Sequence, residues 1–356
     1  MEFESTDRKS YNKSNSKING IEIANLLVGT KLKEYFELVE EIKSGGGGSV
    51  YKAKFTTIKT SKYAALKIIS FKRNNNIREE SNKLKKFKKS YKEKHSEILI
   101  HYKLKSRYIP DVYGYYSINN WGSCIAMEHS SFGDLSNFRK NVLKKYIFSE
   151  TLLCYISWQV LNAISYLHKN KIIHMDIKTQ NILINDYLEI KLADFSVSLD
   201  YKSCQETVCL LNNGTTHFKS PEVLEEREID VKDASKVDIF SLGIVLYYLS
   251  SCDFPYETKY VTDDKQILKN IKEKKLNLEG TKNSEMFKNF LKKCLEKDLN
   301  KRYYIEEALK DPWIKGNYFI LNEKEKLNNA GKFLINMSVD NIIDFNEYVN
   351  GKVKNI

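Results

Sequence analysis

Residues 174–181 carry side chains whose types and spacing suit phosphate chemistry. Asp176 is followed by Lys178 two positions later and by Asn181 three positions beyond that, and the segment lies between two short apolar runs. A polar loop between such runs is where a folded chain can hold side chains open to a ligand. Asp194 comes thirteen residues after Asn181. Two carboxylates and an amide suit a magnesium–phosphate complex, because hard cations take oxygen ligands.

Two short segments resemble motifs of a known family. The loop at 174–181 is similar to the catalytic loop of the eukaryotic protein kinases, and the triplet at 194–196 is similar to their metal-binding motif. Met175 stands where most kinases carry Arg, and Ser196 stands where the triplet has Gly. The chain is therefore identified as a divergent orphan member of this superfamily, of the serine/threonine type. Its wealth of Lys, Asn, Ile and Tyr resembles the coding bias of an AT-rich genome, such as that of an apicomplexan parasite.

The resemblance implies a role for each polar residue of the candidate site. Asp176 is implied to be the catalytic base, and Lys178 to stabilise the phosphoryl group in transfer. Asn181 and Asp194 are implied to hold Mg²⁺ (or Mn²⁺) with ATP. Thr215 resembles the threonine that lines the substrate site of serine/threonine kinases, so together with Lys178 it argues against tyrosine specificity.

Residues 43–48 form a glycine-rich turn between two segments with strand-like alternation. Glycines at such a turn let backbone N–H groups approach an anion closely. Gly45, Gly48 and Val50 match the kinase loop that covers the phosphates of ATP, although Lys43 stands where its first Gly is expected. A hairpin that is merely a turn is the alternative.

The strand-like segment 64–69 resembles the kinase motif that carries an ATP-binding lysine. Lys67 is implied to reach the α- and β-phosphates, with Glu97 of the regulatory helix as its ion-pair partner. Glu93, one helical turn earlier, is the alternative partner. A lysine that extends from an edge strand into solvent is the alternative reading of Lys67.

Segment 124–129 has the pattern of a buried strand that runs into a linker, and it resembles the kinase hinge. The resemblance implies that backbone groups from Glu128 to Ser130 hydrogen-bond adenine and that Met127 is the gatekeeper beside it. The other side chains implied to contact the nucleotide are Asp134 at the ribose and Val50, Ala65 and Leu183 around adenine.

Further positions have implied architectural roles. Apolar residues recur at helical spacing over 152–167, which predicts a long helix before the catalytic loop. Asp238 resembles the Asp that braces the backbone of that loop, and Glu222 is implied to form a buried ion pair with Arg302. His101 is expected to pack against the Phe of the metal-binding triplet, as a satisfied core residue or, alternatively, as a switch.

The predicted fold class is α+β, in the bilobal arrangement of protein kinases. An antiparallel sheet with one regulatory helix forms the small lobe, and the large lobe is mainly helical. The basic insertion near 71–94 is either a solvated helix face or a docking patch. The tail at 317–356 either packs on the domain or binds a partner. The predicted segments are a flexible leader at 1–30, an N-lobe at 31–128 with a basic insertion near 71–94, a hinge and C-lobe at 129–316, and a tail at 317–356.

Composition bears on partners and compartment. The chain has 356 residues with 58 Lys+Arg against 46 Asp+Glu, a formal charge of +12. Such an excess attracts acidic proteins, acidic membranes or nucleic acid, or is simply a solvated lysine surface. Gln180 and Tyr248 replace the acids of arginine-directed kinases, so acidic substrates are expected. The six cysteines form no C-x-x-C pair, and no segment is long and apolar enough to span a bilayer, so we expect an intracellular protein of the cytoplasm or nucleus.

Control by phosphorylation is expected to be unusual. Where this chain has Met175, most kinases have an Arg whose positive charge is neutralised by a phosphorylated activation segment. This chain lacks that charge. Leu211 occupies the usual phosphorylation position, so activity should not depend on phosphorylation there. Thr207 and Ser203 remain candidate sites of other control.

The predicted function is ATP-dependent phosphorylation of serine and threonine hydroxyls on protein substrates. The first alternative is a pseudokinase scaffold that binds nucleotide or partners without efficient turnover, as the altered glycine loop, Met175 and Ser196 suggest. The second is a lysine-rich nucleic-acid binder, although the sequence has no recognition helix or stacking-aromatic motif. Specific nucleic-acid binding is therefore not expected, and the sequence leaves the oligomeric state open.

Overall fold

The computed structural model describes most of the chain between residues 32 and 316. The predicted leader, the basic insertion and the tail lie outside these described residues. The chain divides into two compact units, one of residues 1–72 and 115–126 and the other of residues 73–114 and 127–356. The described ranges are 32–45, 48–58, 62–70, 97–118, 122–140, 148–185, 187–204 and 206–316.

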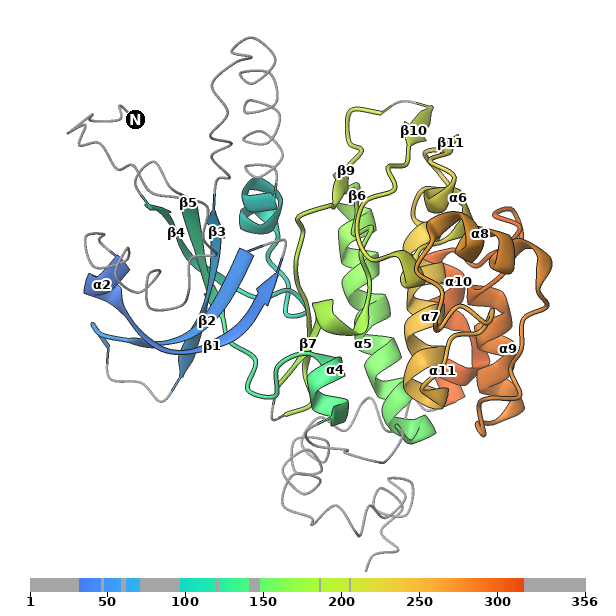
Figure 1. Cartoon of the computed structure of the whole chain (residues 1–356), viewed down its shortest axis with the longest axis horizontal. Helices are drawn as coiled ribbons and strands as arrows, with labels where there is room; N and C mark the ends of the chain where they lie inside the picture. Colours follow the sequence, from blue (N-terminus) through green and yellow to red (C-terminus); the bar gives the residue numbers. More distant parts are fainter. Residues whose placement is uncertain are drawn as a thin grey trace, which may run out of the picture. The chain divides into compact units, whose positions relative to one another are not determined.

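The smaller unit is built on a five-stranded sheet with the order β1-β2-β3-β5-β4 (Figure 1). Strand β2 pairs antiparallel with both β1 and β3. Alternate residues of β2 and β3 form one apolar face, on which Tyr51, Ala53, Leu66 and Ile68 are buried. The elements are α2 (Leu32–Tyr35), β1 (Phe36–Gly45), β2 (Gly48–Phe55), β3 (Tyr63–Ser70), β4 (Val112–Ile118) and β5 (Gly122–Glu128).

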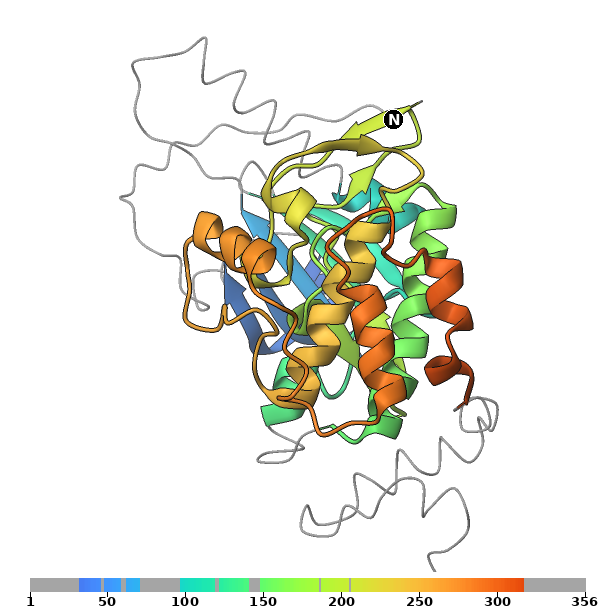
Figure 2. The ribbon, with the colours of Figure 1, turned by 90° about the vertical axis from the view of Figure 1, so that its right-hand side faces the viewer.

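The larger unit is mainly helical. Helix α5 (Glu150–Lys169) packs against α7 (Lys236–Ser251), which in turn packs against α9 (Glu285–Cys294) (Figure 2). Nearly every residue of α7 is buried, as expected for a helix that is apolar on all sides and lies at the centre of a core. Among the described residues, further helices are α4 (Leu135–Phe138), η2 (Thr179–Asn181), η3 (Thr216–Phe218), α6 (Pro221–Leu224), α8 (Asp264–Glu273), α10 (Ile305–Lys310) and α11 (Pro312–Gly316), and residues 97–103 are helical as well.

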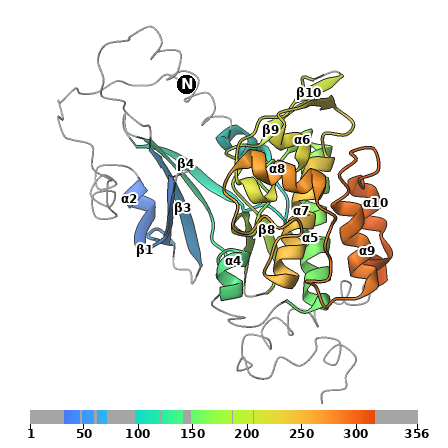
Figure 3. The same ribbon diagram turned by 45° about the vertical axis from the view of Figure 1, so that its right-hand side comes forward.

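Short antiparallel ribbons carry the polar loops of this unit. Their pairs are β6 with β9, β7 with β8, and β10 with β11. Strand β8 packs on α5, so the β7–β8 ribbon is anchored to the helical core (Figure 3). The strands are β6 (Ile172–Ile173), β7 (Ile182–Ile184), β8 (Ile190–Leu192), β9 (Leu199–Asp200), β10 (Thr207–Cys209) and β11 (Glu228–Asp230).

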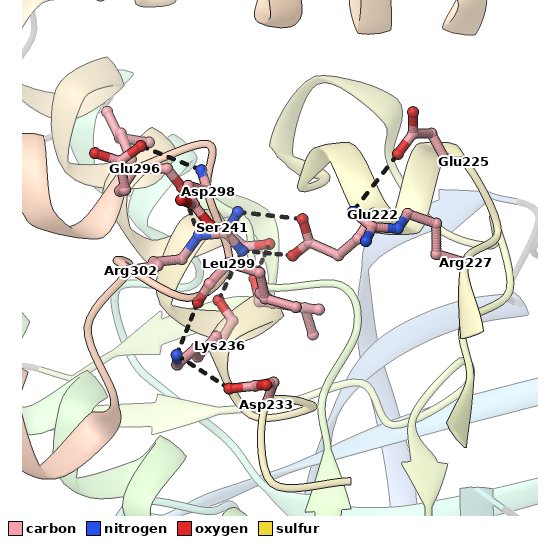
Figure 4. Close-up of polar contacts among 12 residues, drawn as sticks. Glu222, Glu225, Arg227, Asp233, Lys236, Ser241, Glu296, Asp298, Leu299 and Arg302 are labelled. Carbon is pink, nitrogen blue, oxygen red and sulfur yellow. Dashed lines mark hydrogen bonds and ion pairs between the residues drawn. The ribbon is translucent and has the colours of Figure 1, made fainter. Parts of the chain in front are cut away.

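A buried ion pair joins two distant parts of the larger unit (Figure 4). The guanidinium of Arg302 makes a two-pronged contact with the carboxylate of Glu222, in which Nη2 donates to Oε2 at 3.1 Å. The two side chains are 0% and 1% exposed. Arg302 also donates to the carbonyl oxygens of Glu296 (2.8 Å) and Lys236 (3.2 Å), so the buried charge is well satisfied. The predicted ion pair is confirmed.

The α+β class with a sheet in the small unit and helices in the large one is confirmed. The predicted segment boundaries stay a prediction. Residues 97–114 group with the helical unit. The physical reason is packing, because Ile100 and Ile109 belong to the large core and the Leu192 N–H donates to the Tyr108 carbonyl at 2.8 Å.

One predicted boundary is corrected. The turn predicted at 43–48 is shorter, because β1 continues through Gly45, which pairs with Gly48 at the start of β2. The helix predicted over 152–167 lies within α5, which runs from Glu150 to Lys169. Ser149 caps α5 by accepting the Leu152 N–H at 3.3 Å.

Candidate active site

The β7–β8 ribbon brings Asn181 and Asp194 close together. Asn181 closes the short helix η2 directly before β7, and Asp194 lies two residues after β8. The Ala193 N–H donates to the Asn181 carbonyl oxygen at 2.9 Å, which holds the two strand ends side by side. A hairpin therefore places Asp194 beside Asn181, although thirteen residues separate them in sequence.

The backbone of the catalytic loop is held by Asp238 at the start of α7. Its carboxylate accepts the N–H groups of His174 (2.9 Å) and Met175 (3.0 Å), and it also contacts His168 Nε2 at 2.9 Å. Asp238 is fully buried, so these contacts are made without competition from water. The predicted bracing role of Asp238 is confirmed.

Asp176, Lys178, Asn181 and Thr215 form one hydrogen-bonded group. Asp176 Oδ2 accepts from Lys178 Nζ at 2.5 Å and from Asn181 Nδ2 at 3.0 Å. Asp176 Oδ1 accepts the Thr215 N–H at 2.9 Å. Lys178 Nζ also donates to Thr215 Oγ1 at 2.6 Å. The structure thus brings together all four residues that the sequence predicted as catalytic.

Gly214 allows the close approach of Thr215 to Asp176. Its φ is +89°, in the region that favours glycine. A Cβ atom at this position would lie 2.8 Å from Asp176 Oδ1. The sequence analysis did not predict that this residue touches the Asp176 carboxylate.

The side chains present fit a hard cation. Asn181 Nδ2 donates to both the carbonyl oxygen (2.9 Å) and Oδ2 (3.0 Å) of Asp176, which turns the amide oxygen of Asn181 away from that residue. The Asn181 amide oxygen and the Asp194 carboxylate are oxygen donors on neighbouring strand ends, as Mg²⁺ prefers. Among the residues that the structure describes, no group of three or more His, Cys, Asp and Glu side chains has metal-binding geometry. The arrangement suits a cation that takes its other ligands from a phosphate.

The metal-binding triplet is anchored by aromatic packing. Phe195 is buried between the rings of His101 and His174, with centroids 5.1 Å and 5.3 Å away. His101 Nε2 contacts the Pro110 carbonyl oxygen at 2.9 Å, so its ring is a satisfied part of the core. Asp194 adopts a φ of +69°, which non-glycine residues rarely do, and the Ser196 N–H contacts its Oδ1 at 3.4 Å. The predicted contact of His101 with Phe195 is confirmed.

Met175 is buried rather than facing a charged partner. It is 6% exposed and belongs to an apolar cluster with Tyr201, Val208 and Leu210. These three residues lie in or beside β9 and β10, in the segment between the metal-binding triplet and Thr215. Apolar packing therefore links the catalytic loop to this segment at the position where an Arg was expected.

Strand β10, in the segment before Thr215, has acidic neighbours. Thr207 pairs with Asp230 across the β10–β11 ladder, and its hydroxyl contacts the Glu228 carboxylate. Leu211 follows the ribbon and is 57% exposed. Ser203 is exposed as well.

In the smaller unit, three predicted ATP-binding residues share one face of the sheet. Val50 lies directly opposite Lys67 in the β2–β3 ladder, and Ala65 is two residues before Lys67 on the same face. Gly48 has a φ of +119°, and a Cβ there would lie 2.2 Å from the Ile68 carbonyl oxygen, so only glycine fits. The pairing of Lys67 with Glu97 stays a prediction, because the two residues belong to different units. The role of Gly45 also stays a prediction.

The predicted hinge is partly occupied by structural bonds. The Glu128 N–H donates to the Asp111 carbonyl at 2.8 Å, and its carboxylate pairs with Lys191 at 2.7 Å. The Glu128 N–H is therefore bonded within the protein, and the adenine contact predicted for the backbone from Glu128 to Ser130 stays a prediction. The Ser130 carbonyl accepts the Gly133 N–H at 3.0 Å, and Met127 is 7% exposed.

Asp134 has a structural role that the sequence did not predict. It is the N-cap of α4, where Oδ1 accepts the Asn137 N–H at 2.8 Å and Oδ2 accepts from Asn137 Nδ2 at 3.1 Å. Its ribose contact stays a prediction. Leu183 is half-buried between the fully buried Ile182 and Ile184, so it faces away from the core, as an adenine contact requires.

A buried polar network beside Thr215 was missed from the sequence. Lys219 is 4% exposed, and its Nζ donates to Asn212 Oδ1 at 2.6 Å. Asn212 Nδ2 in turn donates to Asp264 Oδ2 at 2.8 Å. Burial lowers the pKa of Lys219. In the sequence, this network is marked only by a lysine directly after Phe218. The position of that lysine does not reveal its distant partners, Asn212 and Asp264.

Comparison with known proteins agrees with this geometry. The family model of the protein kinase domain matches residues 36–314. The chain belongs to the protein kinase family. We therefore refer to residues 36–314 as the kinase domain.

The kinase domain resembles several curated serine/threonine kinases. The chain is 31% identical over 296 residues to serine/threonine-protein kinase dst2 of Dictyostelium discoideum, which covers 82% of this chain and 23% of that protein. It is 30% identical over 308 residues to the MAP kinase kinase MKK1/SSP32 of Saccharomyces cerevisiae, covering 84% of this chain and 55% of that protein. It is 31% identical over 292 residues to serine/threonine-protein kinase mig-15 of Caenorhabditis elegans, covering 79% and 24%. The chain thus spans between about a quarter and about half of these relatives.

No helix in the described part of the chain is long and apolar enough to cross a membrane. An apicomplexan source stays a prediction.

Proposed function

We propose that this chain is a protein serine/threonine kinase that transfers the γ-phosphoryl group of ATP to hydroxyl groups of protein substrates. The observation that carries the proposal is the triangle of Asp176, Lys178 and Thr215. Its three contacts, of 2.5, 2.6 and 2.9 Å, join the Asp176 carboxylate, the Lys178 ammonium group, and the N–H and hydroxyl of Thr215 at one point of the domain.

Each residue of this group has a chemical task. Phosphoryl transfer needs positioning and charge stabilisation more than covalent help. Asp176 orients the substrate hydroxyl and accepts its proton, while Lys178 stabilises the negative charge of the phosphoryl group in transfer. Thr215 holds both side chains in place through its N–H and its hydroxyl. When bound, Mg²⁺ neutralises the phosphates, and Asn181 and Asp194 are the residues that would hold it.

The nucleotide contacts extend the proposal to the smaller unit. Lys67 binds the α- and β-phosphates, and Val50 and Ala65, on the same sheet face, contact adenine. The substrates are acidic proteins, as the charge of +12 and the uncharged Gln180 and Tyr248 suggest. The protein acts inside the cell, in the cytoplasm or nucleus.

The test is phosphoryl transfer to a mixture of cell proteins, with radiolabelled Mg-ATP and the full chain. We expect phosphoserine and phosphothreonine in the products, and losses of at least about 10³-fold in Asp176→Asn and Asp194→Asn. Lys67→Met should be similarly inactive. Equal labelling by the unaltered chain and all three variants would support the pseudokinase alternative instead.

A binding measurement separates loss of chemistry from loss of fold. Mg-ATP should raise the Tm of the unaltered chain and of Asp176→Asn, because Asp176 acts on the acceptor hydroxyl rather than on ATP. Asp194→Asn should lose most of this shift in Tm. Peptides that differ only in a Ser, Thr or Tyr acceptor then test the specificity, and preference for Tyr would contradict the proposal.

A further inference from the structure

An open surface pocket of about 580 Å³ lies in the larger unit, beside helix α6. Its size is within the usual range of ligand pockets, and four of its five lining residues are charged. None of its residues belongs to the catalytic group described above. The lining residues are Pro221, Glu225, Arg227, Lys272 and Lys297.

One carboxylate serves two cations in this pocket. Glu225 pairs with Lys272 and lies 3.9 Å from Arg227 Nη1. The side chain of Glu225 is 23% exposed, whereas Lys272 and Arg227 are 54% and 52% exposed. The positive groups therefore extend further into solvent than the single acid between them. Such exposed pairs contribute little stability, so the two cations can exchange Glu225 for another carboxylate at small cost.

Lys297 is the third cation of the pocket, and its ammonium group is held in one place. Lys297 Nζ donates to the carbonyl oxygens of Lys272 (3.2 Å) and Lys274 (2.6 Å), at the C-terminal end of α8. These bonds hold its ammonium group in place but bring no negative side chain. Among the five lining residues, three cations and one carboxylate leave an excess of positive charge.

The nearby buried ion pair does not change this balance. Figure 4 shows Glu222 turned toward Arg302 and away from the pair of Glu225 and Arg227. Glu222 and Arg302 neutralise each other inside the protein. The ion pair instead gives α6 a rigid support, because it fixes the helix from which Pro221 and Glu225 face the pocket.

We propose that this pocket docks an acidic segment of a protein substrate. Carboxylates of the segment bind Arg227 and Lys272 in place of Glu225, with the guanidinium of Arg227 taking one carboxylate through two parallel hydrogen bonds. Lys297 adds long-range attraction. The inference that the bound acidic segment belongs to a substrate rests on the proposed function. The inference that the pocket binds an acidic segment does not.

The pocket is close enough to the catalytic group for one substrate to use both. Thr215, which is bonded to Asp176, precedes Pro221 by six residues, so their Cα atoms are at most about 21 Å apart. A substrate with about six to ten extended residues between its acidic segment and its acceptor hydroxyl can therefore span them. Docking raises the local concentration of the acceptor, so it should lower KM and leave kcat unchanged.

The first experiment measures binding by fluorescence anisotropy. The probe is a labelled peptide with a run of about six Asp and Glu residues, and its control has Asn and Gln at the same positions. We expect binding of the acidic peptide only, weakened at least about fivefold in the double variant Arg227→Gln/Lys272→Gln. Glu225→Gln should bind about threefold more tightly, because it removes the competing carboxylate.

The opposite signs of these changes exclude a general effect on folding. The matched control is Lys232→Gln/Lys288→Gln, which removes two other lysines that are each paired with one carboxylate. This control should change the Kd by less than about 1.5-fold. Equal binding of the acidic and neutral peptides, or equal weakening in the control, would overturn the proposal. Tighter binding of a single-stranded oligonucleotide that depends on Arg227 and Lys272 would also overturn it.

The second experiment links docking to phosphorylation. Two substrate peptides share one acceptor sequence, and one of them carries the acidic run about eight residues away. The acidic run should lower KM several-fold in the unaltered chain and in the lysine control, but not in Arg227→Gln/Lys272→Gln. If neither peptide is phosphorylated by the unaltered chain while the acidic peptide still binds, the proposed function fails and the docking site stands. If KM does not respond to the acidic run, the pocket is not a substrate-docking site.

Discussion

Asp238 Oδ1 accepts the backbone N–H of Met175 at 3.0 Å, and Met175 adopts a φ of +66°. This left-handed conformation costs a residue with a side chain about 1–2 kcal/mol. The surrounding structure must therefore hold Met175 in this conformation. The carboxylate of a helix that begins about sixty residues later provides that hold, together with the packing of the Met175 side chain. The direction of Asp176, the next residue, depends on this contact.

Asp238→Asn should therefore lower activity through the backbone. An amide has one oxygen, so Asn cannot accept the N–H groups of both His174 and Met175 through two oxygens, and its NH₂ group faces one of them. We expect kcat to fall by about 10²-fold, because a small displacement of Asp176 is costly, and the free energy of unfolding to fall by about 2–4 kcal/mol. Steady-state kinetics and urea denaturation measure the two effects. Ser241→Ala, one turn further along α7, removes only a bond to the Val237 carbonyl and should leave kcat within about twofold.

Gly214→Ala should impair the chemical step. The new Cβ would lie 2.8 Å from Asp176 Oδ1, so Thr215 or Asp176 must move and their 2.9 Å hydrogen bond is lost. We expect kcat to fall by at least about 10²-fold, while the shift in Tm with Mg-ATP is retained. Gly133→Ala is the matched control, because Gly133 also has a positive φ of +70° but a Cβ there meets atoms only at 3.9 Å. An equal loss of kcat in both variants would show that backbone strain, and not contact with Asp176, is the cause.

Phosphorylation of Thr207 should not be required for activity. Its hydroxyl contacts Glu228 and it lies opposite Asp230, so a phosphate there would face two carboxylates. Thr207→Ala should keep kcat/KM within about twofold, in protein that mass spectrometry shows to be unphosphorylated on residues 203–215. Ser203→Ala serves as the companion variant. Complete loss of activity in either variant would contradict the prediction.

The Glu222–Arg302 ion pair should make stability depend on pH in the acidic range. Burial acts to raise the pKa of Glu222, but the charge and hydrogen bonds of Arg302 outweigh it, so the pKa lies below its ordinary value of 4.5. A carboxyl with a lowered pKa contributes stability that is fully present above about pH 4.5 and is lost as the pH falls through the folded-state value. Urea denaturation between pH 3 and pH 7 should show this loss, and the pH dependence should be weaker in Glu222→Gln.

A double-mutant cycle isolates the pair from other acids. Glu222→Gln alone leaves the Arg302 charge buried without its partner and should cost about 3–5 kcal/mol at pH 7. Adding Arg302→Met should recover part of this cost, because no unpaired charge then remains. Additive losses in the double variant would show that the two side chains do not interact energetically.

Residue chemistry made several parts of the site predictable. Asp176, Lys178 and Asn181 could be named as a candidate site because their residue types suit a magnesium–phosphate complex, and the resemblance to protein kinases implied a role for each. The helix over 152–167 could be predicted because its apolar residues repeat with the period of a helix, and the strand that carries Lys67 because it resembles a kinase motif. Other features had no local signal. The sequence showed that Met175 replaces an Arg, but only the fold revealed that it belongs to a buried apolar cluster with Tyr201 and Leu210.

By itself, the sequence indicated the protein kinase family and many of the strands and helices, because both depend on residue type and short-range spacing. The tertiary structure alone decided which way the catalytic groups face, how Asp238 holds the loop, and that Arg227 and Lys272 share one carboxylate. These features arise where segments far apart in sequence pack together, and local periodicity contains no information about which of them meet.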